Sequence, residues 1–174
     1  MKRLVTLLRL VILCAASSLL LIQTAAPAGG EYVHDGVRYS LYVNTRYGFS
    51  IPYPSKLLVP QPPPGNNDGR EFLSRDTSVH MSAWGTYNVM EETLAGRMAA
   101  EMADPGRTVT YEAMNNDWFV LSGFVEGRIF YMRTYLVDDI FYTFLIVYDP
   151  TLSDTFNPIT AYISGEFSVP GAMK

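Results

Sequence analysis

Four consecutive runs of apolar residues in the second half of the chain constrain its fold more than any other feature. The runs are residues 108–114, 118–125, 128–137 and 140–148. The joints between them are Asn115-Asn116-Asp117, Glu126-Gly127 and Asp138-Asp139. These joints are short and rich in residues that tolerate the positive φ angles of tight hairpin turns. The pattern therefore predicts a four-stranded antiparallel meander.

Two-residue turns also predict the register of the meander, because they place Val125 opposite Arg128 and Val137 opposite Ile140. One face then carries four rows of side chains: Trp118, Tyr135 and Tyr142; Val120, Arg133 and Phe144; Ser122, Tyr131 and Ile146; Phe124, Ile129 and Tyr148. The other face carries Leu121, Met132, Leu145, Phe130 and Val147 around Gly123. Because both faces are apolar, we expect other elements to cover both of them.

The first half of the chain predicts further strands. Residues 37–44 alternate between apolar and polar side chains, and residues 49–53 form a second short run that Pro54 ends. Residues 71–74 and 78–84 are typical of a hairpin with its turn near Asp76.

Two helices are predicted as well. In residues 89–103, methionine or leucine recurs every four residues, at Met90, Leu94, Met98 and Met102. Asn88 is the expected N-cap of this helix, with Glu91 completing a capping box. This assignment places Glu91 and Glu92 in the first helical turn, where the macrodipole favours acids.

The second helix is expected over residues 153–164, with Asp154 or Asn157 near its start and Gly165 near its end. Its buried stripe is expected to contain Phe156, Ile159, Ile163 and Phe167. Pro158 is expected in the first turn, where a missing N–H does little harm.

The N-terminus has the three-part pattern of a secretory signal peptide. Basic residues at Lys2, Arg3 and Arg9 precede a 13-residue uncharged apolar run, which is followed by Ala26-Pro27-Ala28. The run is shorter than the roughly 18–20 residues that a membrane-spanning helix needs. We therefore expect cleavage after Ala28, with residues 1–28 as the signal peptide and residues 29–174 as a single domain. The mature protein is expected to be periplasmic or secreted, with no stable membrane span.

Charge and cysteine content exclude several classes of function. Three of the 13 basic residues and none of the 17 acidic ones lie in residues 1–28, which leaves a net charge of −7 for the rest. A nucleic-acid partner is therefore not expected, since phosphate binding needs clustered Lys and Arg. The single cysteine, Cys14, lies in the signal peptide, so the mature domain has no disulfide, thiol nucleophile or thiolate metal ligand.

Residues 47–54, Tyr-Gly-Phe-Ser-Ile-Pro-Tyr-Pro, are similar to the opening strand of PsbP-like domains. The first helix, the meander and the closing segment from Phe156-Asn157-Pro158 to Phe167 follow in the order of that family. The resemblance covers about residues 39–168 and extends to small exported bacterial proteins of unassigned activity. It implies an α+β fold, a twisted antiparallel sheet flanked by helices, and a protein that binds others without catalysing a reaction. It carries over no functional residue.

Residues suited to catalysis are few. The mature chain has two histidines, of which His34 lies in a segment expected to be frayed and His80 alternates with serines on a predicted strand. The adjacent acids Asp138 and Asp139 are explained by a hairpin turn. We therefore assign no catalytic residue, metal ligand or cofactor, and we do not expect an enzyme.

The proline-rich loop of residues 60–69 ends in Gly65-Asn66-Asn67-Asp68-Gly69. Its side-chain oxygens could bind a hard cation such as calcium, but it has one carboxylate and lacks the spacing of a calcium loop. A structured turn is the preferred interpretation.

The aromatic face of the meander is the best candidate for a binding site, at Trp118, Tyr131, Arg133, Tyr135 and Tyr142. The preferred interpretation of this face is nevertheless a part of the core that a helix covers. Arg133 favours a binding role, because its strand neighbours Val120 and Phe144 offer no polar partner. Tyr, Trp and Arg are also the residues enriched in binding hot spots.

The sequence thus predicts an exported, non-catalytic module of the bacterial cell envelope that binds another envelope or secreted protein. One alternative is a small-molecule or ion-binding periplasmic protein that uses a cleft near the proline-rich loop. The other is a hydrolase that uses carboxylates.

Overall fold

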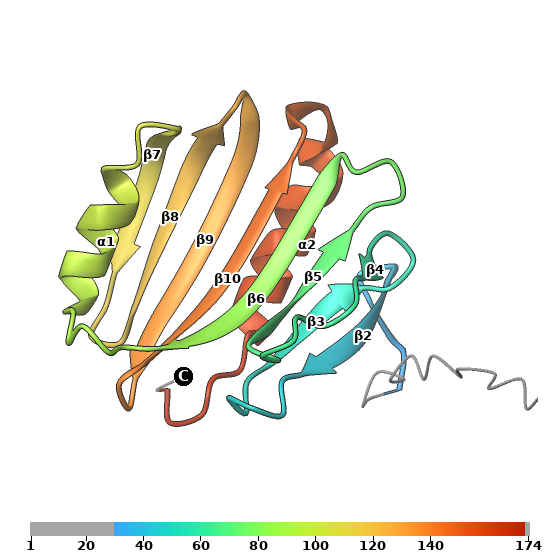
Figure 1. Ribbon diagram of the computed structural model, residues 1–174. Helices are drawn as coiled ribbons and strands as arrows, with labels where there is room; N and C mark the ends of the chain where they lie inside the picture. The colour runs from blue at the N-terminus through green and yellow to red at the C-terminus, as the bar shows by residue number, and fades with distance from the viewer. Residues whose placement is uncertain (1–29, 173–174) are drawn as a thin grey trace, which may run out of the picture.

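Seven strands form one large antiparallel sheet in the order β4-β5-β6-β10-β9-β8-β7 (Figure 1). The computed structural model describes residues 30–172, so the predicted signal peptide lies outside the described residues. The strands of the large sheet are β4 (Val59–Pro60), β5 (Gly69–Leu73), β6 (Val79–Tyr87), β7 (Arg107–Met114), β8 (Trp118–Val125), β9 (Arg128–Val137) and β10 (Ile140–Tyr148).

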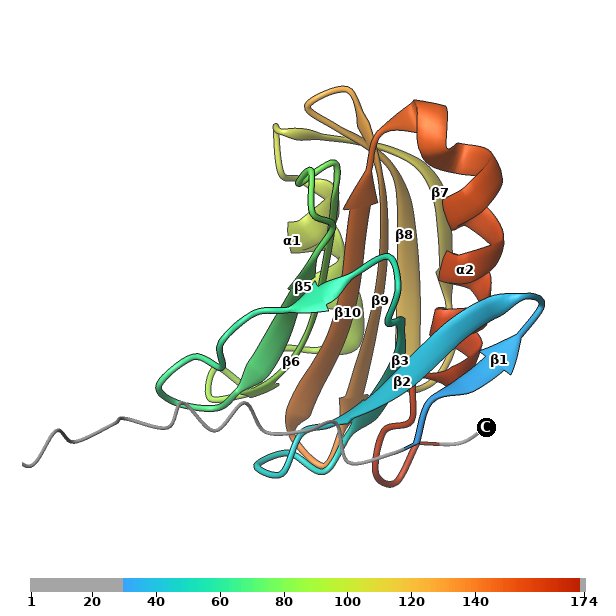
Figure 2. The same ribbon diagram turned by 90° about the vertical axis from the view of Figure 1, so that its right-hand side faces the viewer.

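A second, three-stranded antiparallel sheet and two helices pack on the large sheet. The small sheet contains β1 (Tyr32–His34), β2 (Val37–Val43) and β3 (Ser50–Pro54). Helix α1 (Leu94–Met102) lies on one face of the large sheet. Helix α2 (Ser153–Glu166) and the small sheet lie on the other face, as Figure 2 shows edge-on. The predicted α+β architecture, a twisted antiparallel sheet flanked by helices, is confirmed.

The meander agrees with the predicted register residue by residue. Val125 pairs with Arg128 and Val137 pairs with Ile140, so the four predicted rows cross the sheet as expected. The two-residue turns have positive φ throughout: 50° and 76° at Glu126 and Gly127, and 49° and 57° at Asp138 and Asp139. Both turns thus have the left-handed backbone that matches the twist of the strands they join.

The edge strand β7 contains an irregularity that the pattern did not predict. Its pairing with β8 shifts by one residue between Val109 and Tyr111. Gly123 lies opposite this bulge, and a Cβ atom there would collide with the carbonyl oxygen of Thr108. A glycine is therefore needed where the bulged strand approaches most closely.

The two faces of the large sheet bury separate cores. The face toward α2 and the small sheet buries the larger one, whose most deeply buried members include Phe49, Ile51, Phe72, Phe144 and Ile163. The face toward α1 buries a smaller cluster around Leu94, Phe119, Leu121, Phe130 and Met132. The expectation that both apolar faces are covered therefore holds.

Helix α1 begins later than predicted. Its N-cap is Thr93, whose hydroxyl accepts a hydrogen bond from the Gly96 amide at 3.0 Å. The predicted N-cap, Asn88, closes a preceding turn, and Glu91 has a φ of 53°, which is incompatible with a helix. The predicted first turn with Glu91 and Glu92 is therefore wrong, because local side-chain hydrogen bonds compete with the helix there.

Helix α2 begins at Ser153, as predicted, and its four stripe residues Phe156, Ile159, Ile163 and Phe167 are buried. Asp154 lies in its first turn and Gly165 lies one residue before its last, Glu166, as predicted. A short 3-10 helix, Pro150–Leu152, precedes it, and the Asp149 carboxylate accepts a hydrogen bond from the Thr151 amide at 2.8 Å. Pro158 lies within α2 rather than in its first turn, on the exposed side of the helix.

The predicted frayed segment around His34 is also ordered. His34 ends β1, which pairs with β2, and its imidazole stacks on the Tyr162 ring at a centroid distance of 3.9 Å. An aromatic contact with α2 thus ties the start of the described chain to the domain. None of the described helices is long and apolar enough to cross a membrane.

Candidate binding cleft

Part of the predicted aromatic site belongs to the core. Tyr142 is 3% exposed, and its ring lies edge-on to those of Tyr47 and Phe49. Tyr131 lies under α2, where its hydroxyl hydrogen-bonds the Ser164 hydroxyl at 2.7 Å. These two predicted site residues are therefore held in the covered part of the sheet, in agreement with the preferred interpretation of this face.

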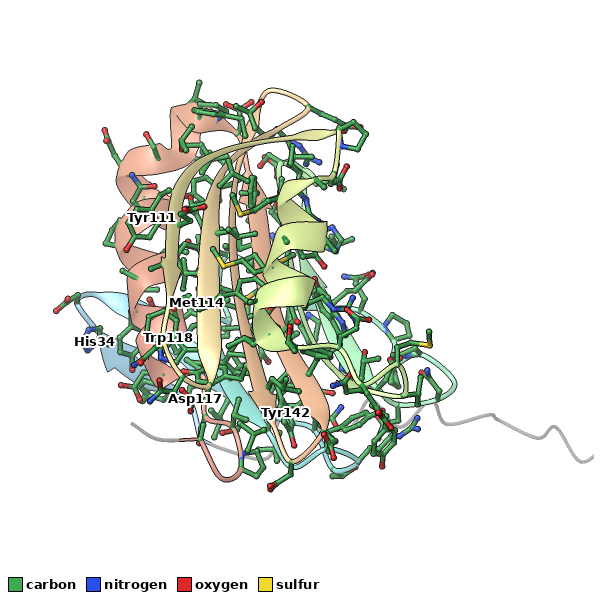
Figure 3. The ribbon with its side chains drawn as sticks, turned by 90° about the vertical axis from the view of Figure 1, so that its left-hand side faces the viewer. His34, Tyr111, Met114, Asp117, Trp118 and Tyr142 are labelled. Atoms are coloured by element: carbon green, nitrogen blue, oxygen red, sulfur yellow. The ribbon has the colours of Figure 1, made fainter. Side chains whose placement is uncertain are left out.

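The other three predicted residues, Trp118, Arg133 and Tyr135, line a cleft of about 590 Å³. Its walls come from the β7–β8 turn, the C-terminal end of α2 and the small sheet, with Asn115, Asp117, Glu166, Tyr32, Leu41, Ser50 and Pro52 among the lining residues. Figure 3 shows Asp117 and Trp118 at this end of the sheet, beside α2. The volume lies within the range of ligand-binding clefts.

Arg133 is fixed at the boundary between the cleft and the core. Its guanidinium carbon lies 4.6 Å from the centroid of the Trp118 ring and 4.8 Å from that of Tyr135. Its Nη1 donates a hydrogen bond to the backbone carbonyl of Ser164 at 3.0 Å. Ser164 lies in the last turn of α2, where free carbonyls and the negative end of the macrodipole favour a cation. The polar partner that the neighbouring strands lack is thus supplied by α2.

The phenols beside Arg133 stay protonated. Burial raises the pKa of Tyr135, and the nearby Arg133 charge opposes that rise. Burial likewise raises the pKa of Tyr131, against the hydrogen bond with Ser164. The charged side chains that line the cleft are therefore Arg133, Asp117 and Glu166. An aromatic wall with one cation and two carboxylates offers both apolar contact and charged hydrogen-bonding groups to a ligand.

A second concavity of about 500 Å³ lies at the proline-rich loop. Pro62, Pro64 and Trp84 contribute to its walls, together with Arg70 and Glu71. Sequence reasoning placed a cleft near this loop but missed Trp84. The sequence feature that could have pointed to Trp84 is Gly69. Gly69 pairs with Trp84, and because it has no Cβ atom the two backbones can approach closely there.

The loop itself is held by hydrogen bonds within it and to Asn44, the residue after β2. The Asp68 carboxylate accepts one from the Asn66 side chain at 2.7 Å, and the Asn44 side chain donates one to the Asn67 carbonyl at 3.1 Å. This geometry fits the structured turn that was preferred from the sequence. Among the described residues, no group of three or more His, Cys, Asp or Glu side chains could hold a metal ion.

The paired carboxylates occupy structural positions. Asp138 and Asp139 form an exposed hairpin turn, as predicted. Glu92 pairs with Arg97 at 3.2 Å. His80 lies on β6 with Nε2 at 3.9 Å from a Glu71 carboxylate oxygen, and its side chain is partly exposed.

Comparison with solved structures identifies the fold. The solution structure of cyanobacterial PsbP (CyanoP) from Synechocystis sp. PCC 6803 matches the chain with a TM-score of 0.56 at 14% sequence identity. The match covers 83% of this chain and 99% of that one, which confirms the predicted PsbP-like fold. No protein-family model and no curated protein matches the chain. Similarity of fold at this identity does not carry a function with it.

Proposed function

We propose that this PsbP-like protein is an exported, non-catalytic binding protein of the bacterial cell envelope, and that another envelope or secreted protein inserts a segment into the cleft at Arg133. The observation that supports the proposal is the placement of Trp118, Arg133 and Tyr135 on one concave surface. Such residues in a desolvated depression are typical of interface hot spots. The hydrogen bond to Ser164 and the two ring contacts hold the guanidinium in place before binding, which lowers the entropic cost of recognition.

The test uses tagged protein of residues 29–174 as bait on an envelope extract of its source, with mass spectrometry of the retained proteins. The decisive variant is Arg133→Met, because methionine keeps an unbranched side chain beside the two rings but removes the charge. Arg128→Met is the matched control, since Arg128 lies at the far end of the same strand and does not line the cleft.

One dominant partner that Arg133→Met loses and Arg128→Met retains would support the proposal, provided that both variants melt cooperatively. Retention of that partner by Arg133→Met would refute the cleft as the binding site. Absence of a specific partner would refute protein binding under these conditions.

The second candidate function is small-molecule binding, and the concavity beside the proline-rich loop favours it. Trp84 there offers an aromatic surface next to Arg70 and Glu71. A thermal-shift screen of ions and metabolites against the parent protein and Trp84→Ala is its test. A ligand that raises the melting temperature of the parent alone would support this function.

A further inference from the structure

A turn at one end of the strands of the large sheet presents apolar side chains to solvent. It connects β6, which ends at Tyr87, to α1, and we call the exposed residues Tyr87, Val89 and Met90 the apolar tip. Val89 is 81% exposed and Met90 is 75% exposed, more than any other large hydrophobic residue among those described. Tyr87 beside them is 52% exposed. Single exposed apolar residues are ordinary, but a group of three at one turn is not.

Hydrogen bonds hold the turn in this conformation. The Asn88 side chain accepts a bond from the Glu92 amide at 2.8 Å and donates one to the Glu92 carbonyl at 2.9 Å. The Asn88 amide donates to the Asp139 carbonyl at 2.8 Å, which ties the turn to the β9–β10 hairpin. The tip is therefore part of the ordered fold, and its display is preorganised.

The local sequence offers a conformation that would bury Met90, and the structure does not adopt it. A helix that began at residue 89 would place Met90 one turn before the buried Leu94, on the same face. Instead, Glu91 adopts a φ of 53°, which is unfavourable for a residue other than glycine. The chain thus accepts backbone strain and exposed apolar surface together, a combination typical of functional segments.

The surroundings of the tip are acidic. Glu91, Asp138 and Asp139 are exposed beside it, Glu92 is paired with Arg97, and the guanidinium of Arg46 lies 6.0 Å from the Tyr87 ring centroid. These six side chains, four acids and two arginines, carry a net charge of −2. A second copy of this surface would bring acids against acids, and an anionic lipid surface would be repelled in the same way. A basic partner is favoured by charge complementarity.

We propose that the apolar tip is a second interaction surface, which inserts Val89 and Met90 into an apolar pocket rimmed by Lys or Arg on a partner protein. None of its residues lines the cleft at Arg133, so this contact is independent of the proposed function. Methionine suits such a contact, because its flexible thioether adapts to an irregular pocket. The acidic side chains around the tip would orient the partner and raise the association rate, and burial of the tip in the partner's pocket would supply the affinity.

The test starts with a photoreactive benzophenone amino acid in place of Met90 in cells of the source, with the same amino acid in place of Thr155 as control. Thr155 is exposed on α2, away from this turn. We expect one cross-linked protein from position 90 that position 155 does not give. Cross-links to lipid or to a second copy, or identical products from both positions, would overturn the proposal.

The identified partner is then purified and its affinity is measured. Val89→Ser/Met90→Ser should weaken binding by at least about thirtyfold, the level of a hot-spot residue, while the melting temperature stays within about 2 °C of the parent. Asp138→Asn/Asp139→Asn should weaken binding and reduce its salt dependence, since Asn keeps the turn geometry without the charge. Unchanged affinity in the serine variant would overturn the proposal, and salt-independent binding would overturn the basic rim.

Discussion

Replacing Tyr135 by alanine tests whether this residue of the aromatic face belongs to the core or to the surface. Tyr135 is 5% exposed, its ring packs edge-on against Phe167 at 5.8 Å, and Arg133 lies over it. Removing about 150 Å² of buried ring at about 25 cal/mol per Å² costs roughly 4 kcal/mol. Loss of the aromatic pair adds up to about 1 kcal/mol, and partial collapse of the cavity subtracts a similar amount. We therefore expect the free energy of unfolding to fall by about 3–5 kcal/mol.

The assay is urea unfolding followed by fluorescence of the two tryptophans, Trp84 and Trp118. With a slope of about 2 kcal/mol per M, the midpoint should fall by roughly 2 M without a change of slope. The matched control is Tyr111→Ala, because Tyr111 lies on the same face of the sheet and is 58% exposed. That variant should lose less than about 1 kcal/mol. A Tyr135→Ala variant as stable as Tyr111→Ala would refute the buried position of the ring and restore the open aromatic face.

Three further measurements test other parts of the structure. Thr93→Ala should cost about 1 kcal/mol, because Thr93 caps α1; if the helix began at residue 89 instead, the same change would stabilise it, and denaturant unfolding gives the sign. Tyr39 has a pKa raised to about 12, mainly by burial, so a titration of phenolate absorbance should find it protonated above pH 10. The pKa of a tyrosine phenol in the unfolded chain is about 10. The stability that the neutral Tyr39 phenol contributes to the folded state is therefore fully present below that pH and is lost as the pH rises toward 12. Gly123→Ala should cost about 2 kcal/mol or more, because its Cβ would meet the Thr108 carbonyl, and faster hydrogen exchange in β7 would locate the damage.

The meander could be predicted in detail because its determinants are local. A two-residue turn between strands allows one register, so identifying Glu126-Gly127 and Asp138-Asp139 as turns was enough to align three strands. The bulge in β7 could not be predicted in the same way. It lies in the edge strand β7, which pairs with a neighbour on one side alone. No turn geometry fixes how many residues of β7 lie opposite each residue of β8.

The start of α1 shows why element boundaries are harder to predict. Asn88 and Thr93 are both good N-caps, and the four-residue recurrence from Met90 onward favours the earlier one. Two kinds of bond favour the later start: the Asn88 side chain bonds the Glu92 backbone locally, and the Asn88 amide donates to the Asp139 carbonyl, which is far away in the chain. No local pattern contains the second bond, and in the turn that both hold together Met90 is exposed.

The division of the aromatic row into core and cleft follows from the dimensions of the elements above it. Trp118, Tyr135 and Tyr142 lie on three adjacent strands, which are about 4.8 Å apart. A helix about 10 Å wide covers two such strands and leaves the third partly open. The small sheet packs over the Tyr142 side, where Phe49 of its β2–β3 turn meets the ring, so the opening falls at Trp118. The register determines which side chains share a face, but the position of α2 determines which of them a partner could reach. Arg133 lies at that boundary, with one nitrogen on the end of α2 and its guanidinium against the ring at the mouth of the cleft.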